Sequence, residues 1–365
     1  MKAKKIVALF LLCCLCSKFV LSSPGRYDAI FNFGDSVSDT GNFLLSGALV
    51  PEIKKLPYGE TFFHHATGRC SNGRLIIDFI AEAFGLPYLP PYLALAKGPH
   101  VRTGVNFAVV GATAIDSSFF YAQNLKLLTN DSLSVQLGWF KNLKSSLCTT
   151  KQECDEYFKR SLFLVGEIGG NDLVNPLVSG RTIKQIRPLV PQVVGAIARA
   201  IRILIEEGAV DLMVPGIFPI SCSAMFLTLC HSPNRSAYDP RTGCLKAYND
   251  FIKYHNNYLK EELQNLREEY PHARIIYADY YGASIPICRT PKHYGFYGGA
   301  LKACCGGSGP YHYNASVTCG DPGSTVCKDP SAFVDWDGNH LTESAYHHVA
   351  NGLIYGGFTS PPLLS

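Results

Sequence analysis

The chain has 365 residues, of which 47% are hydrophobic, 12% aromatic and 17% charged, a composition that excludes a largely disordered protein. Its formal charge of +4 comes from 33 Lys and Arg against 29 Asp and Glu, and four of those lysines lie in the first 22 residues. The rest of the chain is therefore neutral, which argues against nucleic acid or an anionic membrane surface as a partner.

The first 22 residues have the pattern of a secretory signal peptide. A basic start at residues 2–5 precedes an apolar stretch at 6–16, and the small residue Ser22 suits cleavage before Ser23. The apolar stretch is too short to span a bilayer. We therefore expect a signal peptide at 1–22 and a secreted protein without a membrane anchor, located in the extracellular space (apoplast), with the vacuole as an alternative.

Eleven of the 14 cysteines lie beyond the signal peptide. In an exported chain they are expected to form disulfides. The sequence has no CxxC pair, which argues against a zinc site. Close pairs such as Cys148–Cys154 and Cys230–Cys244 are candidate bridges, and the odd number leaves at least one cysteine outside an intramolecular bridge. Three sequons predict glycosylation on the same route, at Asn130, Asn234 and Asn314.

Short apolar strands alternate with helical patterns along the chain. Strands are predicted at residues 28–33, 104–110, 161–165, 210–214 and 273–278, and helices at 75–84, 183–207, 248–269 and 342–352. The 183–207 run is the longest helical pattern. This order predicts an α/β fold, a three-layer α/β/α doubly wound sandwich with a central parallel sheet of about five strands.

No repeat or linker divides residues 23–365, which are predicted to form one domain. Residues 288–330, rich in Gly, Cys and Tyr, are interpreted as a disulfide-tied excursion on that domain.

A serine follows the first predicted strand, in the run Phe33-Gly34-Asp35-Ser36. Because ligands bind open α/β sheets at the carboxyl ends of the strands, Ser36 is a candidate nucleophile. The alternative is that Ser36 or Ser38 only caps a helix. The neighbouring Asp39 is explained by a helix N-terminus and not by catalysis.

The second candidate group lies near the other end of the chain, in the run Asp337-Gly-Asn-His340. A carboxylate three residues before a histidine can reach the imidazole and hold one nitrogen outward as a base. Paired with a distant serine, His340 becomes a candidate general base.

Four blocks in order resemble the plant GDSL esterase/lipase family of the SGNH hydrolase superfamily. They are the block at Ser36, Gly104-Val-Asn-Phe-Ala-Val-Val-Gly111-Ala112, Gly169-Gly170-Asn171-Asp172, and the block at His340. Within the family the chain is most similar to the acetylajmalan esterase and sinapine esterase group.

The resemblance implies Ser36 as nucleophile, His340 as general base and Asp337 as its orienting carboxylate. It also implies an oxyanion hole made by the backbone N–H groups of Ser36 and Gly111 and the side-chain amide of Asn171. Many members have glycine where this chain has Val110. No cofactor is implied.

The resemblance also implies a monomeric serine esterase that hydrolyses small acetyl, phenolic or alkaloid esters. The alternatives are an acyltransferase with the same site and a non-catalytic binding protein on the same fold. Phe119 and Phe120 are candidates for the substrate pocket, or for ordinary core packing. No metal site is expected, because the histidine pairs at 64–65 and 347–348 have no carboxylate or cysteine at ligand spacing.

Overall fold

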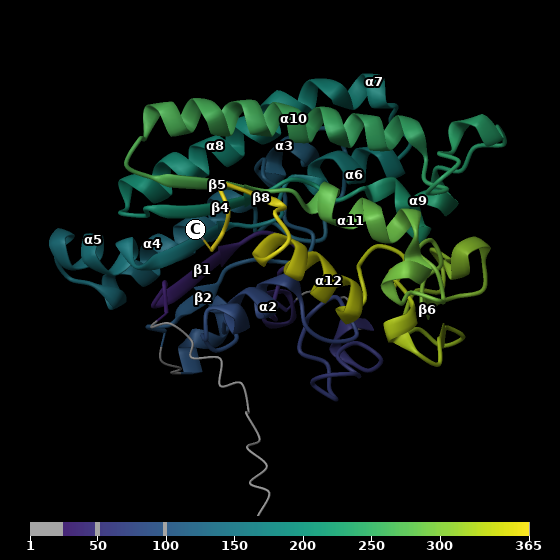
Figure 1. Cartoon of the computed structure of the whole chain (residues 1–365), viewed down its shortest axis with the longest axis horizontal. Helices are drawn as coiled ribbons and strands as arrows, with labels where there is room; N and C mark the ends of the chain where they lie inside the picture. The colour runs from purple at the N-terminus through teal and green to yellow at the C-terminus, as the bar shows by residue number, and fades with distance from the viewer. Residues whose placement is uncertain (1–24, 48–51, 98–100, 365) are drawn as a thin grey trace, which may run out of the picture.

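A six-stranded sheet forms the centre of the computed structural model, in the order β2-β1-β3-β4-β5-β8 (Figure 1). The structure describes residues 25–47, 52–97 and 101–364, so the predicted signal peptide lies outside the described residues. Five strands run parallel: β1 (Ala29–Phe33), β2 (Gly104–Asn106), β3 (Ser161–Val165), β4 (Asp211–Pro215) and β5 (Arg274–Ala278). β8 (Thr359–Ser360) adds an antiparallel edge to β5.

Alternate strand residues point to opposite faces of this sheet, and helices cover both. Ile30, Leu162 and Met213 pack with α2 (Ile76–Ala83), α11 (Tyr280–Arg289) and α12 (Glu343–Ile354). Phe31, Phe163 and Leu212 pack on the other face with α4 (Leu133–Leu147), α8 (Val190–Glu206) and α10 (Lys246–Glu269). The predicted three-layer α/β/α sandwich is confirmed, because apolar side chains on both sheet faces require a helical layer on each.

The remaining helices are short and lie mainly in the connections. They are α1 (Asn42–Leu45), α3 (Ser117–Tyr121), α5 (Lys151–Lys159), α6 (Gly170–Val178), α7 (Ile183–Ile186) and α9 (Ala224–Leu229), with 3₁₀ turns η1 (Glu52–Lys54), η2 (Tyr92–Lys97), η3 (Arg187–Leu189), η4 (Ile220–Cys222), η5 (Arg235–Ala237), η6 (Pro291–Tyr294), η7 (Pro310–His312) and η8 (Pro330–Ala332).

The helix predicted at 183–207 is broken in the structure. Residues 183–186 form α7, a 3₁₀ turn follows, and α8 begins at Val190. Pro188 and Pro191 explain the break, because proline lacks the N–H that a continuous helix needs. The longest described helix is α10, with 24 residues. The stretch Ile183–Glu206 is long and apolar enough to span a membrane, but most of it is buried, which accounts for its composition.

The second predicted strand, 104–110, is shorter than expected. β2 ends at Asn106, although Phe107 and Val109 still donate to the carbonyls of Asn32 and Gly34. At the end of β2, Asn106 Oδ1 accepts from the backbone N–H of Ala108 at 2.9 Å, and further on the carboxylate of Asp39 accepts from the backbone N–H of Val110 at 3.0 Å. The chain then brings Gly111 to the carboxyl edge of the sheet.

Four disulfides connect Cys148–Cys154, Cys222–Cys244, Cys304–Cys327 and Cys305–Cys319. The first candidate bridge is thus confirmed and the second, Cys230–Cys244, is wrong, because Cys244 pairs with Cys222. Cys70, Cys230 and Cys288 are free thiols.

The excursion predicted at 288–330 begins slightly later, because Cys288 belongs to α11. It contains the short pair β6 (Cys305–Gly306) and β7 (Thr325–Val326) and two of the disulfides. The backbone N–H groups of Cys304 and Cys305 donate to the carbonyls of Asp335 and Trp336. The excursion is therefore attached to the residues immediately before Asp337.

Candidate active site

Ser36 lies in a tight turn directly after β1, at the carboxyl edge of the sheet. The backbone N–H groups of Ser38 and Asp39 donate to the carbonyl of Asp35 and close this turn. Helix α1 begins only at Asn42, so the alternative of a capping role for Ser36 or Ser38 is wrong. The carboxylate of Asp39 takes that role by accepting from the N–H groups at the start of α1.

Asp337 and His340 lie on a loop before α12 that carries the imidazole to Ser36. His340 Nε2 is 2.9 Å from Ser36 Oγ, and His340 Nδ1 is 2.8 Å from Asp337 Oδ2. The other oxygen of Asp337 accepts from the backbone N–H groups of Asn339 and His340. Gly338 has a φ of +100°, and a β-carbon there would lie 2.3 Å from the ring of Tyr313. This loop geometry therefore requires glycine at position 338.

Charge in this group favours an ionised Asp337 and a basic His340. Burial raises the pKa of Asp337, but the charge of His340 and its hydrogen bond outweigh burial and lower that pKa to about 2. Burial lowers the pKa of His340, and the charge and hydrogen bond of Asp337 raise it further than burial lowers it. The imidazole is thus poised to accept a proton from Ser36 and to hold it beside a carboxylate.

The three predicted oxyanion donors lie on the Ser36 turn, on the loop after β2 and in the first turn of α6. The backbone N–H groups of Ser36 and Gly111 have no hydrogen-bond partner among the described residues. The side-chain amide of Asn171, in the first turn of α6, donates to Asp35 Oδ2 and to the carbonyl of Ala112, both at 3.0 Å. Both N–H groups of the Asn171 amide are thus engaged, one with the Ser36 turn and one with the Gly111 loop, so one of them must turn away from its partner to reach an oxyanion.

Buried carboxylates hold the Gly111 loop at both ends. Asp39 accepts from the N–H of Val110, one residue before Gly111. Asp172 accepts from the N–H groups of Ala114 and Ile115 at 2.8 and 2.9 Å. Val110 supplies the backbone donor that binds this loop to Asp39.

A cavity of about 100 Å³ opens beside Ser36, His340 and Asn171. Its walls are mainly apolar and come from α6, the loop after β4, η4, α11 and the loop before α12: Val174, Ile217, Phe218, Ile220, Ile287 and Leu341. The carboxyl groups of Asp35, Glu167 and Asp335 also line it. No lysine or arginine belongs to this lining, so within the described residues the cavity has no fixed positive charge.

Phe119 and Phe120 do not line this cavity. Phe120 is fully buried in the fold, and Phe119 packs against its ring at a centroid distance of 5.2 Å. The prediction that they form the substrate pocket finds no support here, because α3 places them in packing contacts instead. Among the described residues, no cluster of three His, Cys, Asp or Glu side chains is arranged for a metal.

The three predicted glycosylation sites differ in how exposed their asparagines are. Asn130 and Asn234 are exposed, and Asn314 is partly buried. Asn130 accepts a hydrogen bond from the hydroxyl of Tyr121 in α3, and Asn234 and Asn314 accept from backbone N–H groups two residues further on. Glycosylation of all three stays a prediction.

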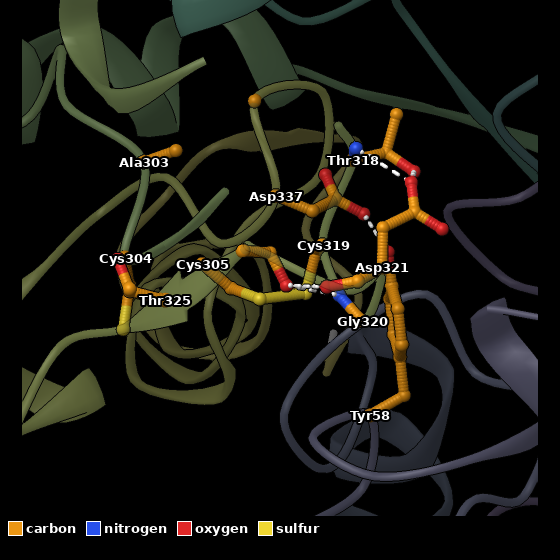
Figure 2. The surroundings of a disulfide bond; sticks show 12 residues. Tyr58, Ala303, Cys304, Cys305, Thr318, Cys319, Gly320, Asp321, Thr325 and Asp337 are labelled. Carbon is orange, nitrogen blue, oxygen red and sulfur yellow. Dashed lines mark hydrogen bonds between the residues drawn. A yellow bond between two sulfur atoms is a disulfide. The ribbon is translucent and has the colours of Figure 1, made fainter. Parts of the chain in front are cut away.

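Tyr58 is a site residue that the sequence analysis missed. Its hydroxyl donates to Asp337 Oδ2 at 2.9 Å, and its ring packs edge-on against Trp336. Figure 2 shows Tyr58 and Asp337 beside the Cys305–Cys319 disulfide of the excursion. No local pattern indicates this contact, since 279 residues separate the two side chains.

Removing only the Tyr58 hydroxyl, with Tyr58→Phe, is expected to lower kcat about three- to tenfold. The phenyl ring still packs on Trp336, but Asp337 loses one of the donors that orient it, and a hydrogen bond to a charged group contributes about 1.5–3 kcal/mol in general. Steady-state kinetics of the variant against the unchanged chain measures the effect. An unchanged kcat would show that the backbone donors to Asp337 suffice.

Comparison with known proteins finds similarity over most of the chain. A profile described as GDSL-like lipase/acylhydrolase matches residues 30–353. Two GDSL esterase/lipases of Arabidopsis thaliana are 55% identical over 343 residues and 47% identical over 339 residues, covering 92% of this chain and 92% and 86% of their own. The sinapine esterase of Brassica napus is 45% identical over 365 residues, covering 98% of this chain and 94% of its own.

Proposed function

Because the chain belongs to the GDSL-like lipase/acylhydrolase family and is a carboxylic ester hydrolase, we propose that Ser36 is the nucleophile of an acyl-enzyme mechanism. His340 is its general base and Asp337 orients the imidazole. The observation that carries this proposal is the continuous hydrogen-bond chain from Ser36 Oγ through His340 to Asp337, with distances of 2.9 and 2.8 Å.

In the first half-reaction, Ser36 Oγ attacks the ester carbonyl carbon while His340 Nε2 takes the hydroxyl proton. The carbonyl oxygen becomes an oxyanion, which the backbone N–H groups of Ser36 and Gly111 stabilise together with the N–H of Asn171 that leaves the carbonyl of Ala112. His340 then gives its proton to the departing alcohol. In the second half-reaction, water attacks the acyl-enzyme with the same base, and Ser36 is regenerated.

We propose a small ester as the substrate, in preference to a long-chain lipid. The cavity volume of about 100 Å³ and its apolar walls favour a short acyl or compact aromatic group. Similarity to sinapine esterase over 98% of this chain supports testing phenolic esters first.

Hydrolysis rates across a series of nitrophenyl esters test this proposal. We expect kcat/KM to be highest for acetyl to butyryl esters and at least about tenfold lower for dodecanoyl and longer ones, because each CH₂ that cannot be buried loses about 0.8 kcal/mol of binding. Product analysis with added alcohols distinguishes hydrolysis from acyl transfer, since an acyltransferase would form a new ester with the added alcohol. A preference that rises with chain length would contradict the small-ester proposal.

We also propose that the protein enters the secretory pathway. Four disulfides are typical of an oxidising compartment, and the three sequons and the predicted signal peptide agree with that route. Glycan mapping at Asn130, Asn234 and Asn314 in protein from plant cells would test it.

A further inference from the structure

Two carboxyl groups lie together beneath the Ser36 turn and take no part in the proposed triad. Asp35 and Glu167 have exposed fractions of only 2% and 4%. Asp35 directly precedes Ser36, and Glu167 follows β3 four residues before Asn171. The backbone N–H of Asp35 donates to the carbonyl of Glu167 at 3.1 Å, and the two side chains share a hydrogen bond.

The surroundings of the pair determine where its proton lies. Asp35 Oδ1 accepts from the N–H of Val37, and Asp35 Oδ2 accepts from the amide of Asn171, both at 3.0 Å. Glu167 Oε1 is buried and has no hydrogen-bond partner among the described residues. An ionised Glu167 would leave a buried charge unpaired, whereas a neutral one needs only to donate its proton. The geometry therefore favours an ionised Asp35 and a protonated Glu167.

Electrostatics leads to the same assignment. Burial and then the charge of Asp35 raise the pKa of Glu167 well above its ordinary value. The other groups that act on the pair include Asp39, Asp172, Tyr280 and His340, of which only His340 can carry positive charge. Two buried carboxyl groups in contact do not both ionise without a cation between them.

We propose that Glu167 is a positioning residue of the oxyanion hole: its carboxyl proton is donated to Asp35, which in turn holds the side-chain amide of Asn171 in place. This inference rests on the proposed function. Asp35 holds one N–H of the Asn171 amide, and the other, which donates to the carbonyl of Ala112, is the one that turns to the oxyanion. Without the donor from Glu167, Asp35 loses one of its three orienting hydrogen bonds, and the amide that it holds becomes less well placed.

Such a displacement matters because oxyanion donors act only when they are preorganised. Removal of one donor altogether costs about 10²–10³ in kcat, and loss of its support costs a part of that. Glu167 lines the cavity near Asn171, so a role in binding substrate is the competing explanation. Binding would change KM, whereas positioning of an oxyanion donor changes kcat.

The experiment compares Glu167→Gln, Glu167→Leu, Asn171→Ala and the double variant Glu167→Leu/Asn171→Ala on a nitrophenyl acetate substrate. Glutamine is the matched control, because its amide can donate to Asp35 without carrying charge. Active sites are counted with a fluorophosphonate probe and folding is checked by thermal unfolding. If leucine prevents folding, Glu167→Met takes its place in the comparison.

We expect Glu167→Gln to keep kcat within about threefold of the unchanged chain and Glu167→Leu to lose about tenfold, with KM altered less than about threefold. In the Asn171→Ala background, Glu167→Leu should have little further effect, because residues that act through one group are not additive. The inference is overturned if Glu167→Gln loses as much activity as Glu167→Leu, or if the loss appears in KM. It is also overturned if the losses of Glu167→Leu and Asn171→Ala multiply in the double variant. Failure of the proposed function would differ, since Ser36→Ala would then keep its esterase activity.

Discussion

Replacing Ser36 with alanine is expected to lower kcat for ester hydrolysis by about 10⁴-fold or more. The hydroxyl forms the covalent bond of the acyl-enzyme, and the loss of a nucleophile that acts together with its base removes nearly all of the rate that the group supplies. Steady-state assays on a nitrophenyl ester, with the concentration of folded protein determined independently, measure the loss.

The fold should survive this change. Ser36 Oγ makes its hydrogen bond with His340, and a single such bond contributes only about 1 kcal/mol to stability. Ser38→Ala is a matched control, because Ser38 lies in the same turn and its buried hydroxyl has no hydrogen-bond partner among the described residues. We expect Ser38→Ala to keep most of the activity. If Ser36→Ala turned over substrate normally while Ser38→Ala did not, the nucleophile would be wrongly assigned.

The second large effect is expected for Asp337→Asn, with a loss of about 10³–10⁴ in kcat/KM. Asparagine can fill the same space, but it does not stabilise the imidazolium and leaves the wrong nitrogen of His340 facing Ser36. Tyr58 and the backbone N–H groups that contact Asp337 keep the loop in place. The loss should be smaller than that of His340→Ala, because the imidazole is still present.

The pH dependence of kcat/KM provides an independent test of the same pair. His340 must be neutral to take the proton of Ser36, so activity rises as pH increases through its pKa. Burial lowers this pKa, but Asp337 raises it to a net value above the ordinary 6.5, so the midpoint of the limb should lie above pH 6.5. In Asp337→Asn the carboxylate is gone while burial stays, and the midpoint should move to lower pH. A flat profile, or an Asp337→Asn enzyme as active as the unchanged chain, would show that His340 is not the base.

Several features of the fold follow from local sequence. The strand β3 has the bounds that its apolar run predicts, and β1, β4 and β5 begin or end within one residue of theirs, because a strand buried on both faces must be continuously apolar. The hydrophobic pattern predicts the bounds of helices and strands less well where prolines or polar side-chain contacts interrupt an element. Pro188 and Pro191 divide the longest predicted helix, and at the end of β2 the side chain of Asn106 accepts the N–H of Ala108.

Disulfide pairing shows the same limit. Cys148–Cys154 is a local bridge across six residues and was a natural candidate. Cys244 is closer in sequence to Cys230 than to Cys222, yet it pairs with Cys222. The sequence separation of two cysteines determines only the entropic cost of closing the loop between them. A disulfide also requires that the fold bring the two β-carbons within about 4 Å of each other.

The sequence by itself determined the chemistry of the candidate site, because each of its motifs is a short run whose residue types and turn glycines are local properties. Ser36 and the Asp337–His340 pair could be predicted in this way, whereas Asn171 was predicted through the resemblance to a known family. Only the tertiary structure decided what surrounds them. Tyr58 contacts Asp337, and Glu167 contacts Asp35, because the sheet order and the loops bring distant segments to one edge. Such contacts depend on packing between elements, and no periodicity within an element records them.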